Sequence, residues 1–205
     1  MRLFKRLTLV AFLFSLILPG KLYAQGVPTP DENLLSGFDW RYVGPAIAGG
    51  RITDVEIVLD DQSHWFIGAA SGGVFESRNR GVTWKPIFDD APNLSIGDIA
   101  LAPSDPLEIW IGTGEANNRN SSPWGAGVFH SSDGGKTWVF KGLEDTRHIG
   151  KVIVHPTDPE TVWVAAVGHL WGPNSERGVY KTTDRGATWT KSLYLDSNTG
   201  VIDIA

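Results

Sequence analysis

Residues Ser131–Trp138 read SSDGGKTW, and two other stretches of the chain follow the same plan. These are SRNRGVTW at Ser77–Trp84 and TTDRGATW at Thr182–Trp189. The tryptophans that close the three copies are 54 and then 51 residues apart. Self-similarity at such a spacing is typical of proteins built from repeated supersecondary units. The chain is therefore expected to be an array of repeats, each about as long as one blade of a β-propeller.

Each repeat has the pattern of four short strands joined by tight turns. The first strand shows apolar alternation or a short apolar run, and it is expected at Ile52–Val58, Ile96–Leu101 and Gly150–Val154. A turn rich in Asp, Pro and Ser follows, and these residue types favour chain reversal. The second strand carries a tryptophan, the third contains Gly-Val-Phe or Gly-Val-Tyr, and the fourth is expected to begin at each closing tryptophan. The second-strand tryptophans are Trp65, Trp110 and Trp163.

Four antiparallel strands per repeat, with no helical segment between them, form a meander. Radial repetition of such meanders gives a β-propeller. A β-sandwich has strands at a similar spacing but no recurring eight-residue turn, so the all-β propeller is the favoured fold class. We expect about three blades and the first strand of a fourth, Gly200–Ile204, within residues 37–205. This domain is interpreted as an incomplete propeller and the N-terminal piece of a longer chain, whose remaining blades would be its partners.

The recurring motif has a mechanical explanation. Its acid or amide side chain can accept hydrogen bonds from main-chain N–H groups of its own turn, its glycine supplies a positive φ angle, and its tryptophan covers the turn. The residues in these three roles are Asn79, Asp133 and Asp184, then Gly81, Gly135 and Gly186, and finally Trp84, Trp138 and Trp189. We interpret the repeated acids as turn-forming residues and not as metal ligands or catalytic groups.

The three motif copies resemble the Asp-box, or BNR, repeat of sialidases, xyloglucan-degrading glycoside hydrolases and sortilin-type propellers. Longer stretches, among them WRYVGPAIAGGRITDV and GHLWGPNSERGVYKTTDRGATW, are similar to bacterial exported proteins of the sortilin-like (VPS10-like), glycosyl-hydrolase BNR type. The resemblance covers about residues 38–205. It implies a β-propeller without a cofactor that either holds a peptide or glycan ligand or cleaves a polysaccharide.

Residues 1–24 have the pattern of a secretory signal peptide. Arg2, Lys5 and Arg6 precede the apolar run Leu7–Leu18, and cleavage is expected near Ala24. The run is shorter than the ~20 residues of a membrane-spanning helix, so a membrane anchor is the weaker alternative. Residues 25–36 are rich in proline and polar residues and are expected to be an extended linker. The mature protein is expected to be secreted or periplasmic, without a membrane span.

The composition is that of a globular protein, since 41% of the 205 residues are hydrophobic and the net charge is −5. A mildly acidic chain without a basic patch is not expected to bind nucleic acid. The chain has no cysteine, which excludes disulfide bonds. No cluster of His and carboxylate residues in the sequence predicts a metal site.

Successive connections of a four-stranded meander alternate between the two ends of the sheet. The loops between second and third strands and those between fourth and first strands therefore share one face, here named the loop face. From the second-strand tryptophan to the motif tryptophan, the three repeats span 19, 28 and 26 residues. The second and third repeats thus carry insertions of nine and seven residues, at Glu115–Ala126 and His169–Arg177. Loops on a rigid scaffold are common places for ligand sites.

The insertions are polar with one tryptophan each, and an aromatic face beside amides and a charge suits a sugar or peptide ligand. The candidate binding residues on the loop face are Asn117, Asn118, Arg119, Trp124, Arg147, His148, His169, Trp171 and Arg177. The alternative is that these loops pack on one another and on further blades, with the two tryptophans as anchors.

A glycosidase needs two carboxylates about 5 to 10 Å apart. The candidates on the loop face are Glu115 and Glu176, with Asp89 and Asp90 beside them, and Glu115 is the best single acid because it follows Gly-Thr-Gly at a strand end. Arg51 faintly resembles the arginine that opens a sialidase site, but the proline of that motif is absent, and a structural ion pair is the favoured role.

No Gly-x-Ser-x-Gly stretch points to a serine nucleophile. The leading hypothesis is a scaffold that binds a peptide or glycan, and the alternative is a glycoside hydrolase on the same fold. Propellers host both functions, so the fold alone does not separate them.

Overall fold

The computed structural model describes residues 51–205, which belong to one compact unit, Pro45–Ala205. The predicted signal peptide and linker, residues 1–36, lie outside the described residues. Apart from one 3₁₀ turn, η2 (Glu144–Thr146), every regular element of residues 51–205 is a strand. No helix in this part of the chain is long and apolar enough to span a bilayer.

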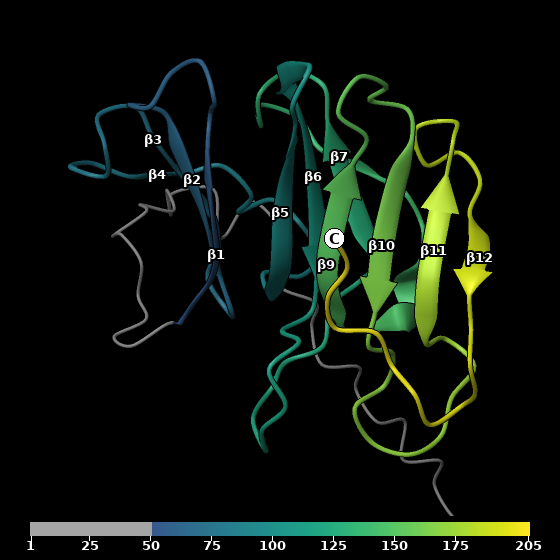
Figure 1. The fold of residues 1–205 in the computed structure, drawn as a ribbon. Coiled ribbons are helices and arrows are strands. Elements are labelled where there is room, and N and C mark those ends of the chain that lie inside the picture. The colour runs from purple at the N-terminus through teal and green to yellow at the C-terminus, as the bar shows by residue number, and fades with distance from the viewer. Residues whose placement is uncertain (1–50) are drawn as a thin grey trace, which may run out of the picture. The chain divides into compact units, whose positions relative to one another are not determined.

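The strands form three four-stranded sheets, each a meander in chain order with antiparallel neighbours (Figure 1). Blade 1 contains β1 (Ile52–Ile57), β2 (Trp65–Ala69), β3 (Gly73–Ser77) and β4 (Lys85–Pro86). Blade 2 contains β5 (Ile96–Ala102), β6 (Asp105–Thr113), β7 (Val128–Ser131) and β8 (Val139–Phe140). Blade 3 contains β9 (Ile149–Val154), β10 (Val162–Ala166), β11 (Gly178–Thr182) and β12 (Thr190–Leu193). These sheets confirm the all-β fold class and the blade as its unit.

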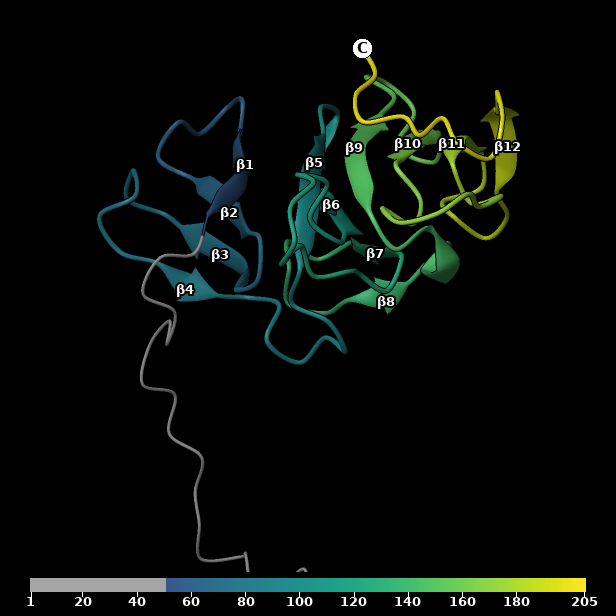
Figure 2. The ribbon, with the colours of Figure 1, turned by 90° about the horizontal axis from the view of Figure 1, so that it is seen from below.

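The first strands of the blades lie next to one another, whereas β4, β8 and β12 lie away from them (Figure 2). Buried apolar side chains, mainly from the first three strands of each blade, fill the space between neighbouring sheets. Phe66, Ile96 and Ile111 belong to one buried cluster shared by blades 1 and 2. Trp110 and Val152 belong to a second cluster shared by blades 2 and 3. Burial of each such side chain stabilises the fold by about 1.5–3 kcal/mol, so the contact between blades is a main source of stability.

The first strands are also joined by acids that cross from one blade to the next. Asp54 Oδ2 accepts a hydrogen bond from the backbone N–H of Ile99 at 3.1 Å. Asp98, at the equivalent position of blade 2, accepts one from the N–H of Val152 at 2.8 Å. Lys151 occupies this position in blade 3, and its ammonium group lies 3.0 Å from Asp98 Oδ1. The repeated position therefore fixes each first strand against the next.

The eight-residue motifs form the turns between third and fourth strands. Asp133 Oδ1 accepts hydrogen bonds from the N–H groups of Lys136 and Thr137, both at 2.9 Å, and Ser131 Oγ accepts one from Gly135 at 2.8 Å. Corresponding bonds join Asp184 to Thr188 and Asn79 to Thr83. The three motif glycines have φ angles of 80°, 85° and 72°. Hydrogen bonds from Thr137 lower the pKa of Asp133 to about 2, since they favour its charged form.

The motif tryptophans extend to the preceding blade. Trp138 Nε1 donates to the backbone oxygen of Ile87 at 2.7 Å, and Trp189 Nε1 donates to that of Lys141 at 2.6 Å. Each indole thus closes the turn of its own blade and attaches it to the blade before. Trp84, in blade 1, has no such acceptor among the described residues.

Two boundaries differ from the sequence prediction. The fourth strands begin one residue after each closing tryptophan, and β4 and β8 are only two residues long. Trp138 and Trp189 turn away to bond the preceding blade, so they do not open a strand. Residues 200–205, expected to begin with a strand, contain none. Val201 N–H donates to the oxygen of Ala166, but no second strand of a further sheet lies beside this segment within residues 51–205.

Candidate functional site

The loop face brings together two segments of blade 2. One is the insertion Glu115–Ala126 between β6 and β7, and the other is the connection Leu143–His148 between β8 and β9. Gly125 N–H donates to the backbone oxygen of Arg147 at 2.6 Å, and His148 Nδ1 lies 2.8 Å from the backbone oxygen of Glu115. These contacts lock the two segments into one surface.

Arg147 has an unusual backbone conformation, with φ 57° and ψ −41°. The N–H of His148 donates to the oxygen of Thr146 at 2.6 Å, which makes Arg147 the centre of a three-residue γ-turn. The γ-turn with positive φ is rare and strained for a residue with a side chain. The bond from Gly125 holds the strained peptide in place. The Cα–Cβ bond of Arg147 therefore leaves the backbone in a fixed direction.

The guanidinium group of Arg147 lies over the indole ring of Trp124, 4.6 Å from the ring centroid. Trp124 remains 59% exposed, although Asn93 Nδ2 donates to its backbone oxygen at 2.9 Å. A cation over an indole ring is attracted by the electrons of the ring. The result is an exposed aromatic side chain with a positive charge beside it.

Glu115 follows the end of β6 and is fully buried. Its Oε1 forms an ion pair with Arg51, which precedes β1, so the pair joins blades 1 and 2. Ser95 Oγ accepts a hydrogen bond from the N–H of Glu115 at 3.0 Å. Within residues 51–205 the second carboxylate oxygen is buried without a partner. These contacts give Glu115 a structural role and keep its carboxyl group away from the surface.

His148 is also buried, and burial lowers its pKa to about 4, with further contributions from the charges of Arg147 and His169. A neutral ring whose Nδ1 faces a carbonyl oxygen must carry its proton on Nδ1. His148 therefore fixes the backbone of Glu115 and does not form part of the exposed surface.

The insertion of blade 3 is built around Arg177. This buried side chain donates through Nη1 to the oxygen of Val167 at 3.1 Å and through Nη2 to that of His169 at 2.8 Å. His169 Nε2 lies 2.9 Å from the oxygen of Asp145, which links the insertion to blade 2. Arg177 is thus occupied inside its own loop. Trp171, by contrast, is 71% exposed.

Glu176 is partly buried in the same insertion. Its carboxylate accepts hydrogen bonds from Ser175 Oγ at 2.6 Å and from the Tyr180 hydroxyl at 3.2 Å. The bond from Ser175 lowers the pKa of Glu176, because it favours the ionised form. A general acid requires the opposite shift, so the local environment does not prepare Glu176 to donate a proton.

The remaining candidates are on the surface of the loop face. Residues 117–119 are exposed in the insertion of blade 2, and Asp89 and Asp90 are exposed between β4 and β5. The structure therefore separates the candidate binding residues by exposure. The exposed ones are Asn117, Asn118, Arg119, Trp124 and Trp171, and the partly covered ones are Arg147 and His169. Glu115, His148 and Arg177 are buried inside the loops.

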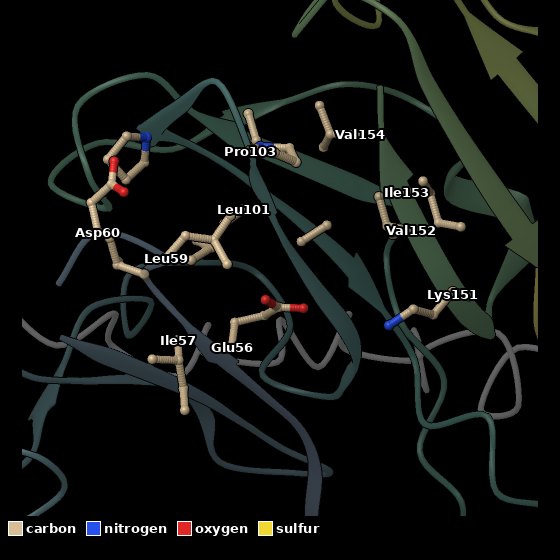
Figure 3. Close-up of a pocket in the computed structure, with 14 residues that line it drawn as sticks. Glu56, Ile57, Leu59, Asp60, Leu101, Pro103, Lys151, Val152, Ile153 and Val154 are labelled. Atoms are coloured by element: carbon tan, nitrogen blue, oxygen red, sulfur yellow. The ribbon is translucent and has the colours of Figure 1, made fainter. Parts of the chain in front are cut away.

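Sequence reasoning missed a cavity of about 300 Å³ between the first strands. Glu56 and Lys151 point toward each other in it, below an apolar wall that includes Leu101 and Val154 (Figure 3). Burial and the charge of Asp54 raise the pKa of Glu56 to about 7. The alternation of β1, which places Asp54 and Glu56 on one side, was the available signal. No group of three or more His, Cys, Asp or Glu residues that could hold a metal ion occurs in the described part of the chain.

The blades and their meander topology define a β-propeller protein. No model of a known protein family matches the sequence. Among curated proteins, it is 24% identical over 167 residues to a xyloglucanase of Paenibacillus sp., covering 75% of this chain and 16% of that protein. It is 25% identical over 179 residues to a xyloglucanase of Acetivibrio thermocellus, covering 80% of this chain and 20% of that protein.

Solved structures give the same fold. An ancestral GH74 enzyme matches with a TM-score of 0.53 and 21% identity over 71% of this chain and 19% of that one. The GH74 xyloglucanase from Xanthomonas campestris matches with a TM-score of 0.51 and 20% identity over 70% and 21% of the two chains. The chain spans about a fifth of the length of these proteins. These comparisons show the propeller fold.

Proposed function

We propose that this chain is part of a propeller protein that acts on a polysaccharide, and that the loop face described above binds the glycan. The observation that carries the proposal is the exposed Trp124, held against Arg147 on a rigid, hydrogen-bonded surface. A flat apolar ring beside directional polar groups suits a sugar, and Trp171 offers a second exposed ring on the same face. The resemblance to xyloglucanases makes xyloglucan the first ligand to test.

Binding is tested by affinity electrophoresis of the protein in gels with and without xyloglucan. We expect xyloglucan to retard the wild-type protein, and a Trp124→Ala/Trp171→Ala variant to migrate as in the gel without glycan. Trp84→Ala is a matched control, since this exposed tryptophan belongs to the opposite end of blade 1. Equal retardation of all three proteins would contradict binding through the loop face.

Beyond binding, we propose that the whole protein hydrolyses the polysaccharide, as the similarity to xyloglucanases suggests. Reducing-end release from xyloglucan measures it directly. Glu115 is buried in an ion pair, and the carboxylate of Glu176 accepts two hydrogen bonds within its own loop. These contacts support a role of the described loops in binding the substrate more than a role in supplying the two catalytic carboxylates. The second candidate, a scaffold that binds a glycan or peptide without cleaving it, is favoured by that same observation. Binding without any release of reducing ends would support this second candidate.

Two further assignments belong to this proposal. Residues 1–24 would direct export, so that the protein meets its polysaccharide outside the cytoplasm. The hydrogen bonds of Asn79, Asp133 and Asp184 support assignment of the repeats to the Asp-box type. N-terminal sequencing of the protein purified from the medium or periplasm tests export, with a new N-terminus expected near Gln25. An uncleaved N-terminus in the cytoplasm would contradict it.

A further inference from the structure

We propose that Arg147 and Trp124 form a subsite for a negatively charged sugar, a uronic acid residue of the polysaccharide. The inference rests on the proposed function and adds the charge of the ligand to it. It begins with the backbone of Arg147. At the ends of the segments Glu115–Ala126 and Leu143–His148, the adjoining residues Gly114, Gly127 and Gly142 have φ near 90°, where a side chain would be strained.

Arg147 bears a side chain at a comparably strained position, the centre of the γ-turn. Glycine would adopt this conformation without the strain, which is of the order of 1–3 kcal/mol. The backbone geometry alone therefore does not explain an arginine here. The turn does not require the guanidinium group, which lies over the exposed ring of Trp124.

The charge of Arg147 is also unbalanced. None of the ion pairs within residues 51–205 includes Arg147, although acidic Glu144 and Asp145 precede it closely in the chain. His169 lies close to this turn, since its Nε2 is 2.9 Å from the backbone oxygen of Asp145. Within residues 51–205 the guanidinium group of Arg147 therefore has no carboxylate partner.

The geometry specifies the kind of anion. A guanidinium group can donate two parallel hydrogen bonds to a carboxylate, and this pairing is stronger than a bond between neutral groups. The neighbouring indole offers an apolar surface for a sugar ring, as an exposed tryptophan does in ligand sites. A uronic acid residue carries both the ring and the carboxylate. Neutral sugars would use the ring of Trp124 but leave the arginine without its partner.

The test compares one glycan with and without its charge. The probes are a glucuronoxylan oligosaccharide and the same oligosaccharide after reduction of its carboxyl groups, and calorimetry gives each dissociation constant. We expect the wild-type protein to bind the acidic form about tenfold more tightly, a difference that decreases at high salt. Arg147→Gln and Arg147→Gly should bind both forms equally.

Arg147→Gly separates binding from folding, because it removes the side chain while relieving the strain of the γ-turn. Its melting temperature should equal or exceed that of the wild type. Arg80→Gln is the matched control, since Arg80 is an exposed arginine with φ 59° in the turn between β3 and β4, at the other end of its blade. This variant should keep the full preference for the acidic form.

Three results would overturn the inference. Equal binding of both oligosaccharides by the wild type would remove the uronate subsite but leave the glycan-binding proposal intact. Absence of binding to these probes and to xyloglucan would remove both. A preference for the acidic form that persists in Arg147→Gly would also contradict the assignment of Arg147.

Discussion

At the residue scale, the ion pair between Arg51 and Glu115 has unequal partners. The side chain of Arg51 is 34% exposed, whereas that of Glu115 has no exposed surface. A charge that loses its partner is destabilising in proportion to its burial, because water cannot solvate a buried group. The two halves of the pair are therefore not equivalent to mutation.

We predict that Arg51→Met destabilises the protein by about 3 kcal/mol, because it leaves the carboxylate of Glu115 buried and alone. Glu115→Gln should cost less, about 1–2 kcal/mol, since Arg51 can turn to solvent. Urea denaturation followed by tryptophan fluorescence measures both. A larger loss in Glu115→Gln than in Arg51→Met would contradict the structural role of this pair.

Glu56 makes stability depend on pH. Its pKa is raised from 4.5 to about 7, first by burial and then by the charge of Asp54. Because the folded state holds the proton more tightly than the unfolded chain, stability is greatest below about pH 4.5 for this group and decreases as the pH rises to about 7. Above that pH the full cost of the charge is present.

Glu56→Gln should therefore stabilise the protein by about 1–2 kcal/mol at pH 8, after allowance for partial exposure, and leave it unchanged at pH 4.5. Asp133→Asn is the contrasting variant, because the pKa of Asp133 is lowered to about 2. It should reduce stability at both pH values. Denaturation at the two pH values tests this, and an equal effect of Glu56→Gln at both would contradict the argument.

At the element scale, the eight-residue motif is both a turn and a joint between blades. The indole N–H of Trp138 bonds the carbonyl of Ile87, whereas Trp84 finds no such acceptor within residues 51–205. Trp138→Phe keeps the ring contact but removes the donor, and it should cost about 1 kcal/mol or more through the unsatisfied carbonyl. Trp84→Phe should be close to neutral. Equal losses of stability in the two variants would contradict the role of the motif as a joint.

The sequence was sufficient to predict elements whose signals are local. The alternation at Ile96–Leu101 and the turn chemistry of SSDGGKTW depend on neighbouring residues, and the observed strand and turn agree with them. The first residue of β8 was not predictable, because Trp138, where the strand was expected to begin, bonds a residue 51 positions away. The meander topology predicted which connections lie at the same end of the blades. Two loops expected on the same face are in contact, since Gly125 N–H donates to the backbone oxygen of Arg147. The γ-turn at Arg147 was not predictable, because it is held by a hydrogen bond from the N–H of Gly125, which belongs to another loop.

At the scale of the whole molecule, the three blades within residues 51–205 pack side by side and give a rigid support for loops that differ between repeats. Neighbouring blades are joined by apolar faces, by the motif tryptophan of the later blade and by an acid in the first strand of the earlier blade. Asp98 makes the last of these contacts for blades 2 and 3. The insertion of blade 3 meets the connection Leu143–His148 where His169 contacts Asp145, and Gly125 bonds that connection to the insertion of blade 2. The exposed rings of Trp124 and Trp171 therefore belong to one connected face.

Loss of the contact at Asp98 should therefore loosen blade 3 relative to blade 2. We predict that Asp98→Ala increases amide hydrogen exchange in β9 about tenfold or more, because Val152 N–H loses its acceptor and Lys151 its partner. Exchange in β2 and β3 should stay as in the wild type. Uniformly faster exchange in all three blades would show instead that the protein opens only as a whole.

The central claim is that the loop face binds a polysaccharide, and one measurement tests it most directly. Calorimetric titration of the wild-type protein and of Trp124→Ala/Trp171→Ala with xyloglucan oligosaccharides compares their dissociation constants under identical conditions. The account predicts binding by the wild type and at least a tenfold loss in the double variant, with unchanged melting temperature. Binding that is equally strong in both proteins, or absent from the wild type for neutral and acidic glycans alike, would contradict it.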